Sequence, residues 1–144
     1  MDDLGAVSVR RSFPRVLGSV EPIFDFLREF FDGQEIPDDD RFGVEVAVEE
    51  LFSNVVRHQP GGDPEVHLAI ERRGSELRVT LTDSGVPPFD IRSLPEVRTD
   101  LPLEQRRPGG LGIHFVKKLM DRIDYSYDGG RSTTVITRTI KGTR

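Results

Sequence analysis

Alternating and helical apolar patterns follow one another along this chain in an order that few architectures accommodate. Apolar spacing of three and four residues predicts helices, over residues 14–33, 38–58 and 111–120. Alternation of apolar and polar residues predicts strands, over residues 7–13, 65–71, 77–82, 122–127 and 132–140. Hairpin signals between successive strands favour antiparallel pairing. The order therefore predicts an α+β fold, a two-layer α/β sandwich with three helices on one face of a mostly antiparallel sheet.

Length and composition narrow the class of protein. A chain of 144 residues is expected to form a single domain, residues 1–144. The absence of cysteine excludes a disulfide framework, a thiolate metal site and a cysteine nucleophile. No apolar run approaches the ~20 residues of a membrane span, and the acidic start is unlike a signal peptide, so a cytoplasmic protein is expected. A formal net charge of −5 argues against direct binding to nucleic acid.

Glu50 and Asn54 lie four residues apart on the predicted helix 38–58. At about 100° per residue they share a row beside the apolar stripe, at the border between core and solvent. An amide oxygen can bind Mg²⁺, which keeps several waters and bridges substrate phosphates. A carboxylate one turn earlier can act as a general base toward an attacking hydroxyl. The alternative is a solvated helix face on which Glu50 bonds Asn54.

Asp83 and Gly85 form a second motif, directly after the predicted strand 77–82. A buried carboxylate at a strand end needs a hydrogen-bond donor, and the exocyclic amine of adenine is a suitable one. Gly85 lacks a Cβ, so the backbone can turn there and a ring can lie close to it. The alternative is an ordinary turn without a ligand.

The stretch from about residue 86 to residue 108 has no apolar periodicity and holds five of the ten prolines. A gap of this length inside a compact domain is often a functional lid. Near its end, Arg106 and Arg107 could reach the phosphates of a small ligand, although arginines in lids are often only solvated.

A glycine-rich run ends this stretch and directly precedes a predicted helix. It consists of Gly109, Gly110, Leu111 and Gly112. Glycines at this place let backbone N–H groups face an anion, and a helix N-terminus favours negative charge. The run lacks the lysine and the hydroxyl residue of a P-loop. The alternative is a flexible hinge without a ligand.

Taken in order, these motifs resemble the Bergerat, or histidine kinase-like, ATPase fold shared by DNA gyrase, a heat-shock chaperone, histidine kinases and mismatch-repair ATPases. Glu50 and Asn54 resemble its N box, and Asp83 with Gly85 resembles its first glycine box. The segment 110–112 resembles its second glycine box. The resemblance covers nearly the whole chain.

Within that superfamily the chain is most similar to bacterial anti-sigma factors that are serine-protein kinases, through residues 49–58, 83–90 and 109–121. The resemblance implies ATP or ADP and Mg²⁺ as cofactors. It also implies adenine bonding by Asp83, Mg²⁺ ligation by Asn54, base catalysis by Glu50 and phosphate contacts from residues 110–112. Pro87 replaces a glycine found in much of the superfamily, which agrees with the anti-sigma branch.

The implied activity is that of an ATP-dependent serine/threonine kinase in a partner-switching system. Such a protein binds a sigma factor and phosphorylates a small antagonist, which can then no longer displace that sigma factor. Two alternatives remain: a non-catalytic ATP-binding regulatory module, and the catalytic module of a larger sensor kinase or phosphatase system. The resemblance leaves homodimerisation open.

Overall fold

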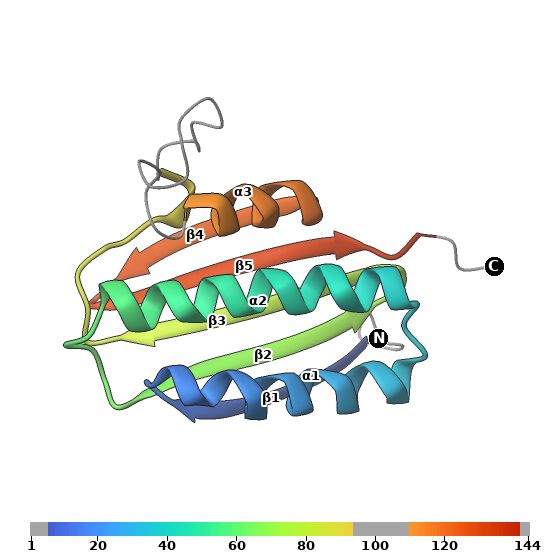
Figure 1. Ribbon diagram of the computed structural model, residues 1–144, viewed down its shortest axis with the longest axis horizontal. Helices are drawn as coiled ribbons and strands as arrows, with labels where there is room; N and C mark the ends of the chain where they lie inside the picture. Colours follow the sequence, from blue (N-terminus) through green and yellow to red (C-terminus); the bar gives the residue numbers. More distant parts are fainter. Residues whose placement is uncertain (1–5, 94–109, 142–144) are drawn as a thin grey trace.

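The computed structural model describes residues 6–93 and 110–141 and shows one antiparallel sheet with helices on one face (Figure 1). The strands lie in the order β1-β2-β3-β5-β4. Their bounds are β1 Ala6–Pro14, β2 Glu65–Arg73, β3 Glu76–Ser84, β4 Arg122–Asp128 and β5 Arg131–Thr139. The helices are α1 Val20–Gln34, α2 Asp38–His58 and α3 Gly110–Leu119, with 3₁₀ turns η1 Leu17–Ser19 and η2 Ile91–Ser93. The predicted α+β sandwich is confirmed.

The core lies between the helices and the covered face of the sheet. Every second residue of β2 and β3 points toward the helices. The apolar residues at these positions are at most 2% exposed: Val66, Leu68, Ile70, Leu77, Val79 and Leu81. The apolar stripe of α2 meets them, and Val44, Val48 and Leu51 are buried as predicted. Burial of this apolar area is the main stabilising contribution to the fold. Among the described helices, none is both long and apolar enough to cross a membrane.

The first helix differs from its prediction at both ends. It begins at Val20 rather than after Pro14, and Val16 is 54% exposed because a 3₁₀ turn intervenes. It continues past Gly33 and ends at Gln34, where Glu35 adopts a left-handed conformation at φ 52°. The N–H of Glu35 bonds the carbonyls of the last turn, so a residue other than glycine closes this helix.

The first turn of α2 contains three aspartates, whose negative charges complement the helix dipole. Asp40 has a second role, because it is 2% exposed and its carboxylate accepts a hydrogen bond from Arg138 Nε at 2.7 Å. Arg138 also donates to the carbonyl of Leu119 at the end of α3. This ion pair ties both helices to β5 at the end of α2 farthest from Asn54.

Candidate functional site

The ends of one helix and two strands meet on the same side of the molecule, and a pocket lies between them. The C-terminal end of α2, the end of β3 and the start of β5 lie together at the left of Figure 1. The pocket is small and opens to solvent. It is lined by Leu51, Asn54, Val55, Gln59, Leu81, Asp83, Phe89, Ile91, Ser132 and Thr134. The structure thus brings Asn54 and Asp83, which are 29 positions apart in the sequence, to the same cavity.

Asn54 lies deeper than the core–solvent border that the sequence predicts, since it is only 2% exposed. Its amide nitrogen donates to the carbonyl of Glu50 at 2.8 Å and to Glu50 Oε2 at 2.7 Å. Its amide oxygen accepts a hydrogen bond from Arg57 Nη2 at 3.2 Å. The contact between Glu50 and Asn54 that the alternative expected is present, but the amide lines the pocket and does not lie on a solvated face.

Glu50 is partly buried beside this amide, with its side chain 17% exposed. Burial raises the pKa of Glu50 above its ordinary value of 4.5, while the hydrogen bond from Asn54 and the charge of Arg57 act in the opposite direction. A carboxyl with a raised pKa that is held one turn from a buried amide has the properties of a general base.

The raised pKa predicts a stability effect of Glu50→Gln in the protein without metal or nucleotide. Because the fold favours the protonated carboxyl, the stability contributed by Glu50 is largest below about pH 4.5 and falls as the pH rises through the folded-state pKa. Glutamine can accept the same bond from Asn54 without charge. We therefore expect Glu50→Gln to melt at a higher temperature than wild type at pH 8, and a lower melting temperature there would contradict the raised pKa. The difference should vanish at pH 4.

Asp83 is 1% exposed at the end of β3, on the face of the sheet that the helices cover. Its Oδ1 accepts a hydrogen bond from Arg15, and both side chains of this ion pair are buried. Arg15 comes from the segment after β1, and no periodicity in the sequence indicated it. The predicted buried carboxylate is therefore in place, with a protein donor on one of its oxygens.

Gly85 adopts φ 73°, a conformation that favours glycine. A Cβ built there would lie 2.6 Å from Oδ1 of Asp63, so the close neighbour of Gly85 in this structure is the loop before β2. The backbone N–H of Asp63 bonds the carbonyl of Ser84 at 2.9 Å. The turn that the sequence predicts is present, and it joins two loops beside the pocket.

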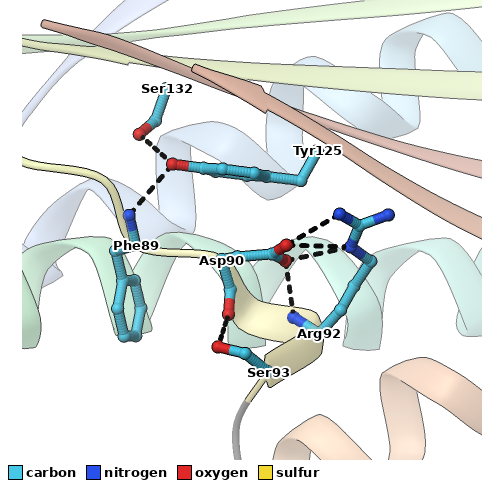
Figure 2. A network of polar contacts seen from close by, with 6 residues as sticks. All are labelled: Phe89, Asp90, Arg92, Ser93, Tyr125 and Ser132. Carbon is cyan, nitrogen blue, oxygen red and sulfur yellow. Dashed lines mark hydrogen bonds and ion pairs between the residues drawn. The ribbon is translucent and has the colours of Figure 1, made fainter.

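Two tyrosine hydroxyls of β4 hold the first part of the predicted lid against the sheet. Tyr125 Oη accepts a hydrogen bond from the N–H of Phe89 at 2.9 Å and bonds Ser132 Oγ at 2.8 Å (Figure 2). Tyr127 Oη donates to the carbonyl of Val86 at 2.6 Å. The ring of Phe89 also stacks on His58, with 5.1 Å between the centroids. These bonds attach Val86 and Phe89 to β4, and Phe89 and Ile91 of the same segment line the pocket.

Tyr125→Phe is expected to free the amide of Phe89 while leaving the fold intact. Loss of one hydrogen bond to a buried group changes the free energy of local opening by about 1 kcal/mol, so exchange of this amide hydrogen should be roughly five- to tenfold faster. Tyr127→Phe is the matched control, because it leaves the bond to Phe89 in place. Equal exchange rates of the Phe89 amide in wild type and Tyr125→Phe would contradict the role of this hydroxyl.

The glycine-rich run is only partly covered by the structure. Arg106, Arg107 and Gly109 lie outside the described residues, as does the rest of the predicted lid beyond Ser93. The helix begins at Gly110 rather than at Leu111, so residues 110–112 form the first turn of α3. The backbone N–H groups of this first turn have no hydrogen-bond acceptor within the helix.

Some lining residues escaped the sequence interpretation. Phe89 and Ile91 fall in a stretch without periodicity, which gives no signal for their position. Ser132 and Thr134 carried a weak signal, because both face the helices from β5, where apolar residues are expected. Polar residues on the covered face of a strand indicate a cavity or a ligand.

Comparison with known proteins identifies the family of this chain. The sequence matches the family described as histidine kinase-like ATPase domain over residues 13–138. The serine-protein kinase RsbW of Halalkalibacterium halodurans is 28% identical over 96 residues, which are 64% of this chain and 59% of that protein. RsbW of Listeria innocua is 32% identical over 100 residues, 64% of this chain and 62% of that protein. The serine/threonine-protein kinase BtrW of Bordetella bronchiseptica is 26% identical over 101 residues, 67% of this chain and 69% of that protein.

Solved structures show the same architecture. The RsbU and RsbW domains of a Mycobacterium tuberculosis protein match with a TM-score of 0.68 at 14% identity, over 93% of this chain and 32% of that chain. The SiaB–SiaC complex of Pseudomonas aeruginosa matches with a TM-score of 0.57 at 17% identity, over 92% and 89%. The chain spans less than two thirds of the length of the two RsbW relatives. Since the family match includes all three helices and most of the sheet, the chain belongs to the histidine kinase-like ATPase domain family.

Proposed function

We propose that this protein binds ATP with Mg²⁺ and transfers the γ-phosphoryl group to a serine or threonine hydroxyl of a small partner protein in the cytoplasm. The partner is an anti-sigma-factor antagonist, and the chain itself binds a sigma factor when the antagonist is phosphorylated. Support comes from the family, from relatives named serine-protein kinases and from the pocket.

One observation carries the proposal: a buried amide on α2 and a buried carboxylate on β3 line the same pocket, with a partly buried carboxyl bonded to the amide. These groups are Asn54, Asp83 and Glu50. Each has a separate task in phosphoryl transfer, namely metal binding, base recognition and proton abstraction. A pocket serving only packing would place apolar side chains at these positions.

Asp83 would recognise the nucleobase at the floor of the pocket. An ionised carboxylate is an acceptor-only group, so it suits the exocyclic amine of adenine. Leu51, Val55 and Ile91 supply apolar surface for the ring around it. Gly85 would act here by maintaining the turn that follows Asp83.

Asn54 fits a role as the protein ligand of Mg²⁺. Its amide oxygen already accepts from a cationic group, Arg57 Nη2, so a positive partner suits this position. Within residues 6–93 and 110–141, no group of three or more His, Cys, Asp and Glu side chains could hold a metal. Mg²⁺ bound here would therefore share phosphate oxygens and waters with one amide oxygen, as this ion usually does. When bound, it neutralises phosphate charge.

Glu50 would take the proton of the acceptor hydroxyl as that oxygen attacks the γ-phosphorus. The raised pKa of Glu50 favours this step. The phosphates would lie toward residues 110–112, whose backbone N–H groups open α3 and attract negative charge. Gly109, Arg106 and Arg107 are proposed as further phosphate contacts.

The proposal is tested by incubating the chain with γ-labelled ATP, Mg²⁺ and candidate small antagonist proteins, followed by phosphoamino-acid analysis. The expected product is phosphoserine or phosphothreonine on one candidate. Nucleotide binding without transfer to any candidate would favour the regulatory-module alternative. Label that appears on a histidine would support the sensor-kinase alternative.

A further inference from the structure

Arg15 lies in the segment between β1 and α1 and places its guanidinium against Asp83, which lines the proposed nucleotide pocket. All three of its nitrogens donate hydrogen bonds: Nε to the carbonyl of Asp63 at 2.7 Å, Nη1 to the carbonyl of Gln59 at 2.9 Å, and Nη2 to Asp83 Oδ1. Its side chain is 6% exposed. Two backbone carbonyls thus fix the guanidinium, and its third nitrogen orients the Asp83 carboxylate.

The loop after α2 leaves space for the guanidinium of Arg15 because it has a glycine, Gly62, beside that group. A Cβ built on Gly62 would lie 2.2 Å from Nη2 and 2.5 Å from Cζ of Arg15, distances that real Cβ atoms essentially never show. The N–H of Gly62 bonds the carbonyl of Gln59 at 3.2 Å, so the same loop supplies both an acceptor for Arg15 and the space beside it. The guanidinium therefore sits in a slot shaped for it and is not a loosely placed surface cation.

The ion pair has a consequence for any ligand that reaches Asp83. A buried carboxylate without a counter-charge is strongly unfavourable, and Arg15 supplies that charge. The ionised group has no proton to donate. A purine with an amine at position 6 can donate to it. A purine with an oxygen there presents a second acceptor, so no hydrogen bond forms between this oxygen and the carboxylate.

We propose that Arg15 is a positioning residue for nucleobase selection, holding the Asp83 carboxylate in one orientation so that a 6-amino purine is accepted and a 6-oxo purine is rejected. This inference rests on the proposed nucleotide-binding function. Arg15 does so through Asp83 and need not touch the nucleotide. Its partners lie 44 to 68 positions away in the sequence, so only the folded chain brings the four groups together.

The test is the ratio of the dissociation constants of GTP and ATP, each measured by calorimetry with Mg²⁺. Wild type should prefer ATP by about 10²-fold, the upper end of the penalty for a buried polar group left without its hydrogen-bond partner. In Arg15→Met this ratio should fall at least tenfold. Arg15→Lys keeps the charge but lacks the planar fork that reaches three acceptors, so its ratio should be intermediate.

Arg138→Met is the matched control, because it breaks another arginine–aspartate pair, with a buried aspartate, at the far end of α2. It should lower the melting temperature and leave the GTP-to-ATP ratio at the wild-type value. If Arg15→Met does not fold, Arg15→Lys decides. An unchanged ratio in a folded Arg15 variant, or tighter ATP binding by it, overturns the role of Arg15 while nucleotide binding stands. A wild type that binds neither nucleotide overturns the proposed function as well.

Discussion

Glu50→Ala is expected to slow phosphoryl transfer to the antagonist by about 10²–10⁴-fold, the usual contribution of a positioned general base. The carboxyl lies beside Asn54 at the pocket wall but does not line the pocket itself. ATP affinity should therefore stay within a few fold of wild type. The measurement is single-turnover transfer from γ-labelled ATP, with the dissociation constant of ATP determined separately.

Glu49→Ala is the matched control for this prediction. Glu49 precedes Glu50 on α2 and is exposed to solvent, so it shares the residue type and the helix but not the contact with Asn54. Its transfer rate should equal that of wild type. Full transfer activity in Glu50→Ala would show that another group takes the proton, and loss of ATP binding in the same variant would reassign Glu50 to the nucleotide site.

Asp83→Asn is expected to abolish the preference for adenine and to destabilise the protein. The amide keeps the shape of the side chain but removes the negative charge, so the buried guanidinium of Arg15 loses its counter-charge. Breaking one partner of a buried ion pair lowers the free energy of unfolding by about 3–5 kcal/mol. We expect a loss of this size in urea unfolding. ATP affinity should fall at least about tenfold, since an amide nitrogen facing the adenine amine would repel it.

Asp40→Asn is the matched control that separates the loss of stability from the loss of adenine recognition. Asp40 is also 2% exposed and is paired with a partly buried arginine, but it lies 14 residues before Asn54 on α2, about 20 Å along the helix axis. Its stability loss should be comparable while ATP affinity stays at the wild-type value. An Asp83→Asn protein that discriminates ATP from GTP as wild type does would remove Asp83 from base recognition.

The sheet and the long second helix were predictable because their signals are local. Alternation in β2 and β3 marks the covered face residue by residue, and the stripe Val44, Val48 and Leu51 marks the buried side of α2. Predicted bounds fall within a few residues of the observed ones for these elements. The start of α1 was predicted wrongly because Val16 continues the apolar spacing without being buried.

The depth of the site could be predicted less well than its residue types. Helical periodicity places Asn54 beside the apolar stripe. Its exposure of only 2% depends on β3, β5 and the segment with Phe89 and Ile91, which line the same pocket. Arg15 gave no pattern at all, since its partner Asp83 lies 68 positions away. Long-range pairing of charged groups depends on the packed tertiary structure, and no local propensity encodes it.

The central claim is that the pocket between α2 and the ends of β3 and β5 holds an adenine nucleotide. The most direct measurement is a titration of ¹⁵N-labelled protein with ADP and Mg²⁺, followed by amide chemical shifts. The largest changes are predicted for the side-chain amide of Asn54 and the backbone amides of Asp83, Ile91 and Thr134, all in the pocket lining. Unchanged spectra, or changes confined to the open face of the sheet around His67 and Thr80, would contradict it.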